Sequence, residues 1–478
     1  MKQIVSLAFI LLLVVSSSGQ DQQVPQDRPP GGLNVEEAPQ FIVIGFDDNT
    51  EAAPLQWILD FMKDKKNPTS SSNNPLTFDG LPIRTSFYLS PQYNVNNQAL
   101  KDMVKRAYDE GHEIGNHTST HPHNYKMNSD WTSIEEILMV ESDWISEINA
   151  CTDWLVGCGI PEDKIVGFRC PFLEYSASTF NALNNLGFTY DCSIEEGFQY
   201  NMTGSKLLWP YTLDWGSPGN KILVSWGSKA DVPEIAGLWD VPNYIMTVPP
   251  DNLADKYEFD MGLRKRMFQT QSWFDTTAGK VTGFDYNLWG LAAEGAFELK
   301  ANEFLAILKY TLDLRYEGNR APLMVGAHTQ FYEDAWSSVN APNASTAEMR
   351  KSIEDFIDYA LTLDDVRIVP AIKIIEWCRN PIKLGTTPIS HTPISDNKPF
   401  KASIGVVTPE TIKIIVPSAG NYSLDVYTLA GEKIAAIQKG FLTRGAHIIY
   451  WQGQQFSRQT YLVTLKGSRY KTVKRAIF

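Results

Sequence analysis

The sequence predicts a distorted (β/α) barrel of seven to eight strands, in the α/β class, followed by a small all-β sandwich domain. Two observations predict this arrangement. Between residues 41 and 370, short apolar runs typical of buried strands alternate with longer amphipathic segments typical of helices. Beyond residue 400 the chain changes to short runs of alternating polar and apolar residues separated by turn residues, a pattern that favours a sandwich.

The alternating region supplies eight predicted strands and six predicted helices. The strands cover residues 41–46, 83–89, 113–116, 164–169, 188–192, 222–226, 323–327 and 366–370. The helices cover residues 54–63, 97–111, 134–155, 176–186, 301–314 and 346–361. Strands joined by helices of this length pair in parallel, and eight of them favour a barrel. A doubly wound open sheet is the alternative fold.

Changes of composition divide the chain into five predicted segments. They are a signal peptide at 1–19, a flexible lead-in at 20–39, a large α/β domain at 40–380, a linker at 381–399 and a sandwich domain at 400–478. The linker is predicted because four prolines interrupt a stretch rich in Gly, Thr and Ser.

The N-terminus has the features of a secretory signal peptide. Lys2 supplies positive charge, residues 4–15 form an apolar run too short to span a bilayer, and residues 16–19 are small. We therefore expect cleavage before Gln20 and a mature protein without a transmembrane segment, either secreted or held at the cell surface.

Charge and cysteine content narrow the possibilities further. A formal net charge of −13 is unsuited to a nucleic-acid partner, because phosphate binding needs a basic face. The five cysteines are compatible with an oxidising compartment, and their spacing forms no paired CxxC zinc site. Cys170 and Cys192 each end a predicted strand, so a bridge between them is one plausible pairing; an odd number leaves at least one thiol without an intrachain partner.

Polar residues with metal-binding and acid–base chemistry follow several of the predicted strands. Four of the seven histidines lie between residues 112 and 123, and His117 and His121 are four residues apart. Imidazole nitrogens and carboxylates together are good zinc ligands. An isolated HxxxH is weak evidence, because most such histidines are solvated or structural.

Polar residues at other strand ends of the predicted barrel strengthen the interpretation of the histidine pair as metal ligands. Asp47 and Asp48 directly follow the first strand, Arg169 ends a later strand, and His328 follows the strand at 323–327. Each residue alone is as well explained by a turn, a surface ion pair or a structural role. The carboxyl ends of barrel strands meet at the face where barrel active sites are built, so the four groups together predict an active site.

These segments resemble the motifs of the polysaccharide deacetylase family, carbohydrate esterase family four. Residues 45–48 (Gly-Phe-Asp-Asp) are similar to the first motif, 117–121 (His-Thr-Ser-Thr-His) to the second and 169–172 (Arg-Cys-Pro-Phe) to the third. The segments 167–173, 187–191, 208–214, 237–242 and 319–322 resemble the animal-type chitin deacetylases, in the same order. The resemblance covers residues 39–381 and implies a barrel fold.

The resemblance implies a role for each matching residue. Asp48, His117 and His121 would hold a divalent metal, with zinc expected. Asp47 would be the general base and Arg169 would orient it. The backbone N–H of Phe172 would stabilise the oxyanion and His328 would protonate the departing amine.

Four further residues complete the implied site. Asp214 would bind substrate or support His328, and Pro171, Trp209 and Trp239 would line a sugar groove, although each of these three is as readily a core residue. The chain departs from the family pattern at Gly45, where many members have Thr, at Cys170, and at the loosely matching Gly326 and Ala327 before His328. None of these changes removes a predicted ligand or acid–base group, so an active enzyme is expected.

The sequence thus predicts a secreted, metal-dependent deacetylase acting on chitin or chito-oligosaccharides. Peptidoglycan and acetylxylan are alternative substrates, and a catalytically silent carbohydrate-binding protein and a cell-surface structural protein are alternative functions. The tail resembles the β-sandwich domains that direct bacterial proteins through type nine secretion, which would make the secretion machinery a partner. The alternative for the tail is carbohydrate binding, with Tyr450 and Trp451 as stacking residues.

Overall fold

The chain divides into two compact units, Met1–Ser390 and His391–Phe478, in a computed structural model. The structure describes residues 22–69, 73–129, 133–225, 230–386, 403–407, 411–416, 420–429, 431–442, 445–451, 456, 459–467 and 471–477. The predicted signal peptide and most of the predicted linker lie outside these residues. No helix within the described ranges has the length and apolar character needed to cross a membrane.

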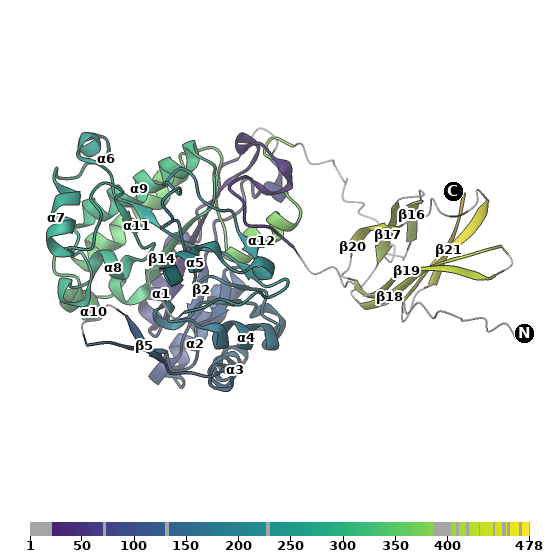
Figure 1. Cartoon of the computed structure of the whole chain (residues 1–478), viewed down its shortest axis with the longest axis horizontal. Coiled ribbons are helices and arrows are strands. Elements are labelled where there is room, and N and C mark those ends of the chain that lie inside the picture. Colours follow the sequence, from purple (N-terminus) through teal and green to yellow (C-terminus); the bar gives the residue numbers. More distant parts are fainter. Residues whose placement is uncertain are drawn as a thin grey trace, which may run out of the picture. The chain divides into compact units, whose positions relative to one another are not determined.

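The first unit is built on one curled, mostly parallel sheet, which confirms the predicted distorted (β/α) barrel (Figure 1). The strand order is β14-β1-β2-β3-β6-β7-β10-β9, with β15 also paired to β1. Only the β9–β10 pair within this sheet is antiparallel. Its strands are β1 (Gln40–Asp47), β2 (Ser86–Leu89), β3 (Glu113–Asn116), β6 (Gly167–Phe168), β7 (Tyr190–Asp191), β9 (Tyr211–Thr212), β10 (Trp239–Asp240), β14 (Leu323–His328) and β15 (Val366–Ile368).

Helices between the strands cover the sheet. The longer ones are α1 (Ala52–Met62), α2 (Gln98–Asp109), α3 (Glu141–Gly157), α4 (Ala177–Leu186), α9 (Ala301–Glu317), α11 (Thr346–Ala360) and α12 (Ala371–Arg379). Local sequence sets several starts: the Asn97 side chain accepts from the Leu100 N–H, and Ser345 and Glu348 form a capping box. Shorter helices are α5 (Pro218–Ser225), α6 (Ala254–Tyr257), α7 (Leu263–Thr270), α8 (Asp285–Trp289) and α10 (Asp334–Asn340).

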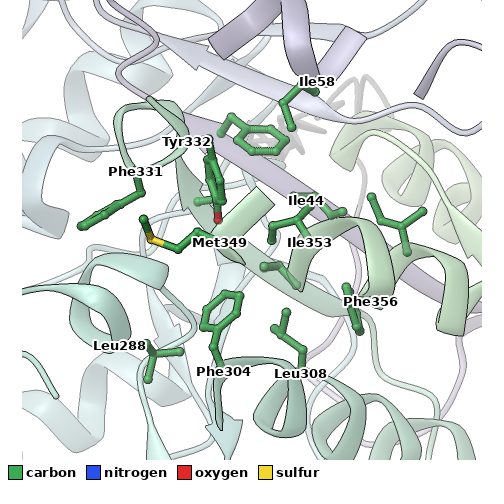
Figure 2. Packing of buried hydrophobic residues seen from close by; sticks show 14 of the residues in the cluster. Ile44, Ile58, Leu288, Phe304, Leu308, Phe331, Tyr332, Met349, Ile353 and Phe356 are labelled. Carbon is green, nitrogen blue, oxygen red and sulfur yellow. The ribbon is translucent and has the colours of Figure 1, made fainter. Parts of the chain in front are cut away.

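Part of the largest apolar core lies between β1 and the pair α9 and α11, which pack side by side. Figure 2 shows Phe304 of α9 and Ile353 and Phe356 of α11 gathered around Ile44 of β1. All four side chains are fully buried. β1 is buried along its whole length, which holds its carboxyl end in a fixed position for the residues that follow.

Two predicted elements are wrong. Residues 222–225, predicted as strand, belong to helix α5, because Ser217 caps it through the Asn220 N–H and Pro218 occupies its first turn. The predicted helix at 134–155 begins later: Ile134–Ile137 is β5, paired antiparallel with β4 (Tyr125–Met127), and α3 starts at Glu141. Shorter pairs join β8 (Glu195–Glu196) to β11 (Asn243–Tyr244) and β12 (Met246–Thr247) to β13 (Lys280–Val281).

All five cysteines are free and buried, so the plausible Cys170–Cys192 bridge is not formed. Burial raises the pKa of the Cys158 thiol to about 11 and that of Cys151 to about 12. Thiols of this kind stay protonated at neutral pH and behave as small apolar groups.

The second unit is all β, as predicted. One sheet has the order β16-β17-β20 and the other β19-β18-β21-β22. Their bounds are β16 (Ser403–Val407), β17 (Thr411–Val416), β18 (Gly420–Tyr427), β19 (Lys433–Leu442), β20 (Gly445–Tyr450), β21 (Thr460–Gly467) and β22 (Lys471–Ile477). Leu424, Val426 and Val463 are in its core, and Trp451 packs against this core and stacks on Phe456 with ring centroids 5.9 Å apart.

Candidate active site

The carboxyl ends of four parallel strands bring the predicted polar residues together. Asp47 ends β1 and is in register with His328, which ends β14. His117 follows β3, and Arg169 follows β6, the next strand in the sheet. Residues separated by more than 200 positions in sequence therefore line one edge of the barrel.

Asp48, His117 and His121 form a compact set of candidate metal ligands. One ligand atom from each residue lies within 4.8 Å of the other two. The Asp48 Oδ1 atom is 3.5 Å from His117 Nε2 and 3.1 Å from His121 Nε2. This Oδ1 atom is buried and has no hydrogen-bond partner, which is the state expected of an oxygen shaped to meet a cation. The three residues therefore fit a divalent metal.

A surrounding shell of hydrogen bonds orients the ligands. His117 Nδ1 is 2.6 Å from the carbonyl oxygen of Arg169, so Nδ1–H donates there and the Nε2 lone pair faces Asp48. Gln330 Nε2 donates to Asp48 Oδ2 at 2.7 Å. Asp48 and His121 both adopt positive φ, at 63° and 58°, which is uncommon for residues other than glycine.

The protonation states suit ligation. Burial alone would raise the pKa of Asp48, but the neighbouring imidazoles of His117 and His121 outweigh it and hold that pKa well below its ordinary value. Burial and the neighbouring His117 lower the pKa of His121 to about 4. At neutral pH, Asp48 is therefore a carboxylate and His121 a neutral imidazole, the forms that bind metal.

Asp47 and Arg169 form a buried ion pair beside these ligands. Arg169 Nη1 donates to Asp47 Oδ1 at 2.7 Å, and the arginine side chain is 0% exposed. The Nε–H of Arg169 donates to the Cys192 carbonyl at 3.2 Å. A charge-assisted hydrogen bond of this kind fixes the orientation of the Asp47 carboxylate.

His328 pairs with a carboxylate, Asp285, that the sequence motifs did not mark. His328 Nδ1 is 2.7 Å from Asp285 Oδ1, and the His328 backbone N–H donates to Oδ2 at 2.9 Å. Burial would lower the pKa of His328, but the charge of Asp285 outweighs it and raises that pKa to about 9. At neutral pH His328 is therefore an imidazolium whose Nδ1–H is held by Asp285. A sequence feature that could have marked Asp285 is its position directly after the short run 281–284, which resembles the position of Asp47 at the end of an apolar run.

Asp214 does not support His328, which was one of its two predicted roles. Its Oδ2 accepts from the Gly237 N–H at 3.1 Å and its Oδ1 accepts from Gln22 Nε2 at 3.2 Å. Asp285 occupies the position beside His328 that was expected for Asp214. Asp214 therefore ties the lead-in and a distant loop together and does not support His328.

The predicted groove-lining tryptophans are also wrong, because they are core residues. Trp209 is 0% and Trp239 1% exposed. Trp209 stacks on Trp377 with ring centroids 5.7 Å apart, and its indole N–H donates to the Asn319 carbonyl. Pro171 is buried as well. A side chain sealed in this way has no surface to offer a sugar.

Phe172, next to Pro171, is the aromatic residue that the site does expose. Its side chain is 51% exposed and its φ is 54°. Its ring lies flat on His123, with centroids 3.8 Å apart, and stands edge-on to the candidate ligand His121 at 4.4 Å. Glu174 accepts from the backbone N–H of Asn124 and so fastens this loop to the segment after the metal ligands. The role of the Phe172 N–H stays a prediction.

Residues 35–190 match the family model for polysaccharide deacetylase. The chain contains a polysaccharide deacetylase domain. The match includes Asp47, Asp48, both candidate histidine ligands and Arg169, whereas His328 and Asp285 lie beyond it.

The relatives of this deacetylase domain include proteins from an animal and a bacterium. Chitin deacetylase 8 of Bombyx mori is 23% identical over 358 residues, which cover 74% of this chain and 74% of that protein. Chitin deacetylase 1 of Bombyx mori is 23% identical over 357 residues, 74% of this chain and 53% of that protein. A peptidoglycan-N-acetylglucosamine deacetylase of Bacillus cereus is 29% identical over 100 residues, 18% of this chain and 35% of that protein.

Solved structures similar to the deacetylase domain include a family 4 carbohydrate esterase from Streptomyces lividans in complex with acetate. It is 20% identical with a TM-score of 0.23, and the match covers 32% of this chain and 61% of that one. The 4-alpha-glucanotransferase from Thermococcus litoralis is 10% identical with a TM-score of 0.37, over 71% of this chain and 40% of that one.

Proposed function

We propose that this protein is a secreted, metal-dependent hydrolase that removes N-acetyl groups from chitin or chito-oligosaccharides. The observation that carries the proposal is the Asp48–His117–His121 cluster at the strand ends that also carry the buried Asp47–Arg169 ion pair and the His328–Asp285 pair. Amide hydrolysis needs an activated water, a stabilised oxyanion and a protonated leaving amine, and the site offers a group for each.

Asp48, His117 and His121 would hold the metal, for which zinc suits the mixed imidazole and carboxylate ligands. When bound, the metal supplies Lewis acidity that polarises the acetyl carbonyl and lowers the pKa of water. The chain's own residues carry the proton transfers. Asp47, held by Arg169, accepts a proton from the attacking water as its oxygen bonds to the acetyl carbon.

His328 and the backbone of Phe172 act in the later steps, in which the oxyanion is stabilised and the amine leaves. The N–H of Phe172 donates to the oxygen on which negative charge develops. His328, protonated at neutral pH, delivers a proton to the nitrogen as the carbon–nitrogen bond breaks. The products are acetate and a free amine on the sugar, and Asp285 retains the His328 Nδ1–H throughout.

The substrate class rests on the relatives rather than on a contact in this chain. The two silkworm relatives, each matched over 74% of this chain, carry chitin deacetylase in their names. A second candidate substrate is peptidoglycan, because the bacterial relative has the higher identity, 29%, over its shorter match of 100 residues. Acetylxylan is a third substrate for the test.

We also propose that the C-terminal sandwich directs export and anchoring through a type nine secretion machinery. Trp451, one of the two residues considered for sugar stacking, instead packs against the sandwich core and Phe456. This packing favours sorting over carbohydrate binding. Deleting residues 400–478 in the native host should leave the protein inside the cell, as seen by fractionation, and unchanged export would contradict the sorting role.

Acetate release from a panel of glycans tests the proposed function. The panel comprises N-acetylated chito-oligosaccharides, peptidoglycan and acetylxylan, each assayed as prepared, with a chelator, and with zinc added after chelation. We expect acetate from chito-oligosaccharides, lost with the chelator and restored by zinc. Release from peptidoglycan alone would reassign the substrate. No release from any of the three would refute the deacetylase function.

A further inference from the structure

Arg169 is held in the barrel by two aromatic rings as well as by its hydrogen bonds. Its guanidinium carbon lies 4.4 Å from the ring centroid of Tyr88 on β2 and 5.1 Å from that of Phe284. All three side chains are buried, so the cation meets ring faces rather than water. Desolvated cation–π contacts are the strong ones of their class.

Three glycines in the sheet make room for these rings. A Cβ on Gly115 of β3 would stand 2.5 Å from Tyr88, and a Cβ on Gly326 of β14 would stand 2.4 Å from Phe284. A Cβ on Gly45 of β1 would stand 2.8 Å from the Arg169 Nη1 atom. Distances under about 3.0 Å force a shift, so these positions are small because the rings and the guanidinium occupy the space beside them.

Both rings are fixed in place independently of Arg169. The Tyr88 hydroxyl is hydrogen-bonded to that of Tyr190 at 2.9 Å. Phe284 forms a parallel bridge with Gly326, whose N–H donates to the Gly283 carbonyl at 2.8 Å. The next residue along the chain is Asp285, the partner of His328. The Phe284 ring thus contacts Arg169 and also lies 5.7 Å from the His328 ring, centroid to centroid, while the Asp285 carboxylate pairs with His328.

We propose that Tyr88 and Phe284 form an aromatic clamp that positions Arg169, and through it the base Asp47, in the reaction. This inference rests on the proposed deacetylase function. Ring faces attract a cation without neutralising its charge, whereas a second carboxylate would compete with Asp47 for the guanidinium. The clamp therefore directs the Arg169 charge at Asp47. Tyr88 and Phe284 are positioning residues, since neither is expected to touch the substrate.

Steady-state kinetics of the full chain test the clamp. Phe284→Leu and Tyr88→Leu should each lower kcat by about ten- to thirtyfold, the loss that corresponds to one desolvated cation–π contact, with little change in KM. Tyr88→Phe keeps the ring and should recover most of the loss. The matched control is Phe356→Leu, which makes the same change in the core between β1 and α11, far from the strand ends.

A merely structural role predicts a different pattern. In that case Phe284→Leu and Phe356→Leu would lose comparable stability, and their kcat values, corrected for the folded fraction, would be indistinguishable. That result would overturn the clamp. A rise in KM without a fall in kcat would also overturn it, because the rings would then be acting on substrate binding.

A spectroscopic measurement tests the clamp without turnover. In protein labelled with ¹⁵N-arginine, the Arg169 Nε–H resonance, assigned by its loss in Arg169→Lys, should lie upfield because the ring currents of Tyr88 and Phe284 act on it. Phe284→Leu should move it towards the other arginine signals, and a resonance that is unshifted in the parent would refute the clamp. Absence of acetate release from the parent, with the shifted resonance intact, would refute the proposed function while supporting the clamp.

Discussion

We assign proton transfer to two parts of this site, and their charges are arranged in opposite ways. On the base side a carboxylate, Asp47, faces a buried cation, Arg169, 2.7 Å away. On the acid side a cation, His328, faces a buried carboxylate, Asp285, also 2.7 Å away. Each reacting group is therefore prepared by a fixed neighbour of opposite charge in a low-dielectric setting, where such pairs act strongly. One edge of the barrel thus presents a carboxylate beside a fixed cation and an imidazole beside a fixed carboxylate.

The largest effect is expected from removing a ligand of the candidate metal site. Asp48→Asn exchanges the negatively charged ligand for a neutral one, so we expect loss of bound zinc and of acetate release together. Metal content by atomic absorption and acetate release measure this. Gln330→Ala is the matched control, because it removes only the hydrogen bond to Asp48 Oδ2 and should weaken metal affinity by about 10–100-fold. Parent-like zinc content in Asp48→Asn would remove Asp48 from the ligand set.

The second largest effect is expected on the pH dependence of kcat/KM, when the His328–Asp285 pair is changed and the Asp47–Arg169 pair is left intact. If His328 must be protonated, kcat/KM falls as pH rises through its pKa of about 9. Asp285→Asn removes the charge that raises this pKa while the lowering by burial remains, so the alkaline limb should move to lower pH. Asp214→Asn, which changes a loop carboxylate bonded to Gly237 and Gln22, should leave the limb in place. A limb shifted by Asp214→Asn and not by Asp285→Asn would contradict the pairing of His328 with Asp285.

The smallest effect on chemistry is expected at the buried tryptophans. Trp209→Ala should lower the free energy of unfolding by about 3–5 kcal/mol, the range for a large buried aromatic residue. KM for chito-oligosaccharides, measured on the folded fraction, should stay at the parent value. A raised KM with unchanged stability in denaturant unfolding would instead return Trp209 to the sugar groove.

Residues whose partners are close in the chain were the easiest to recognise from sequence, whereas Arg169 and His328 were marked by the predicted strands that they end or follow. Asp47 and Asp48 are adjacent, and His117 and His121 are four apart, so a local pattern was enough to mark them. Asp285 lies 43 residues before His328, and only the packing of the 283–285 segment beside β14 joins the two. No local motif carries that information.

Local sequence patterns also explain two wrong predictions, the strand at 222–226 and the tryptophans of the sugar groove. The β-branched and apolar run at 222–226 predicted a strand, but the cap at Ser217 and the proline after it start a helix there. Tryptophan suits a sugar-binding groove and a core equally well in sequence, and burial decides between them. The barrel was predicted from the alternation of strands and helices over hundreds of residues, so a wrong assignment of one element did not change that prediction.

The proposed mechanism depends on different roles for two adjacent aspartates. Asp47 acts as the base, and Asp48 is a ligand of the metal site. Measuring zinc content and acetate release together in Asp47→Asn tests it most directly, because only one of the two carboxylates should affect metal binding. We predict one equivalent of zinc, as in the parent, and a fall in turnover of about 10²–10⁴-fold. Acetate release near that of the parent, or loss of the zinc, would contradict it.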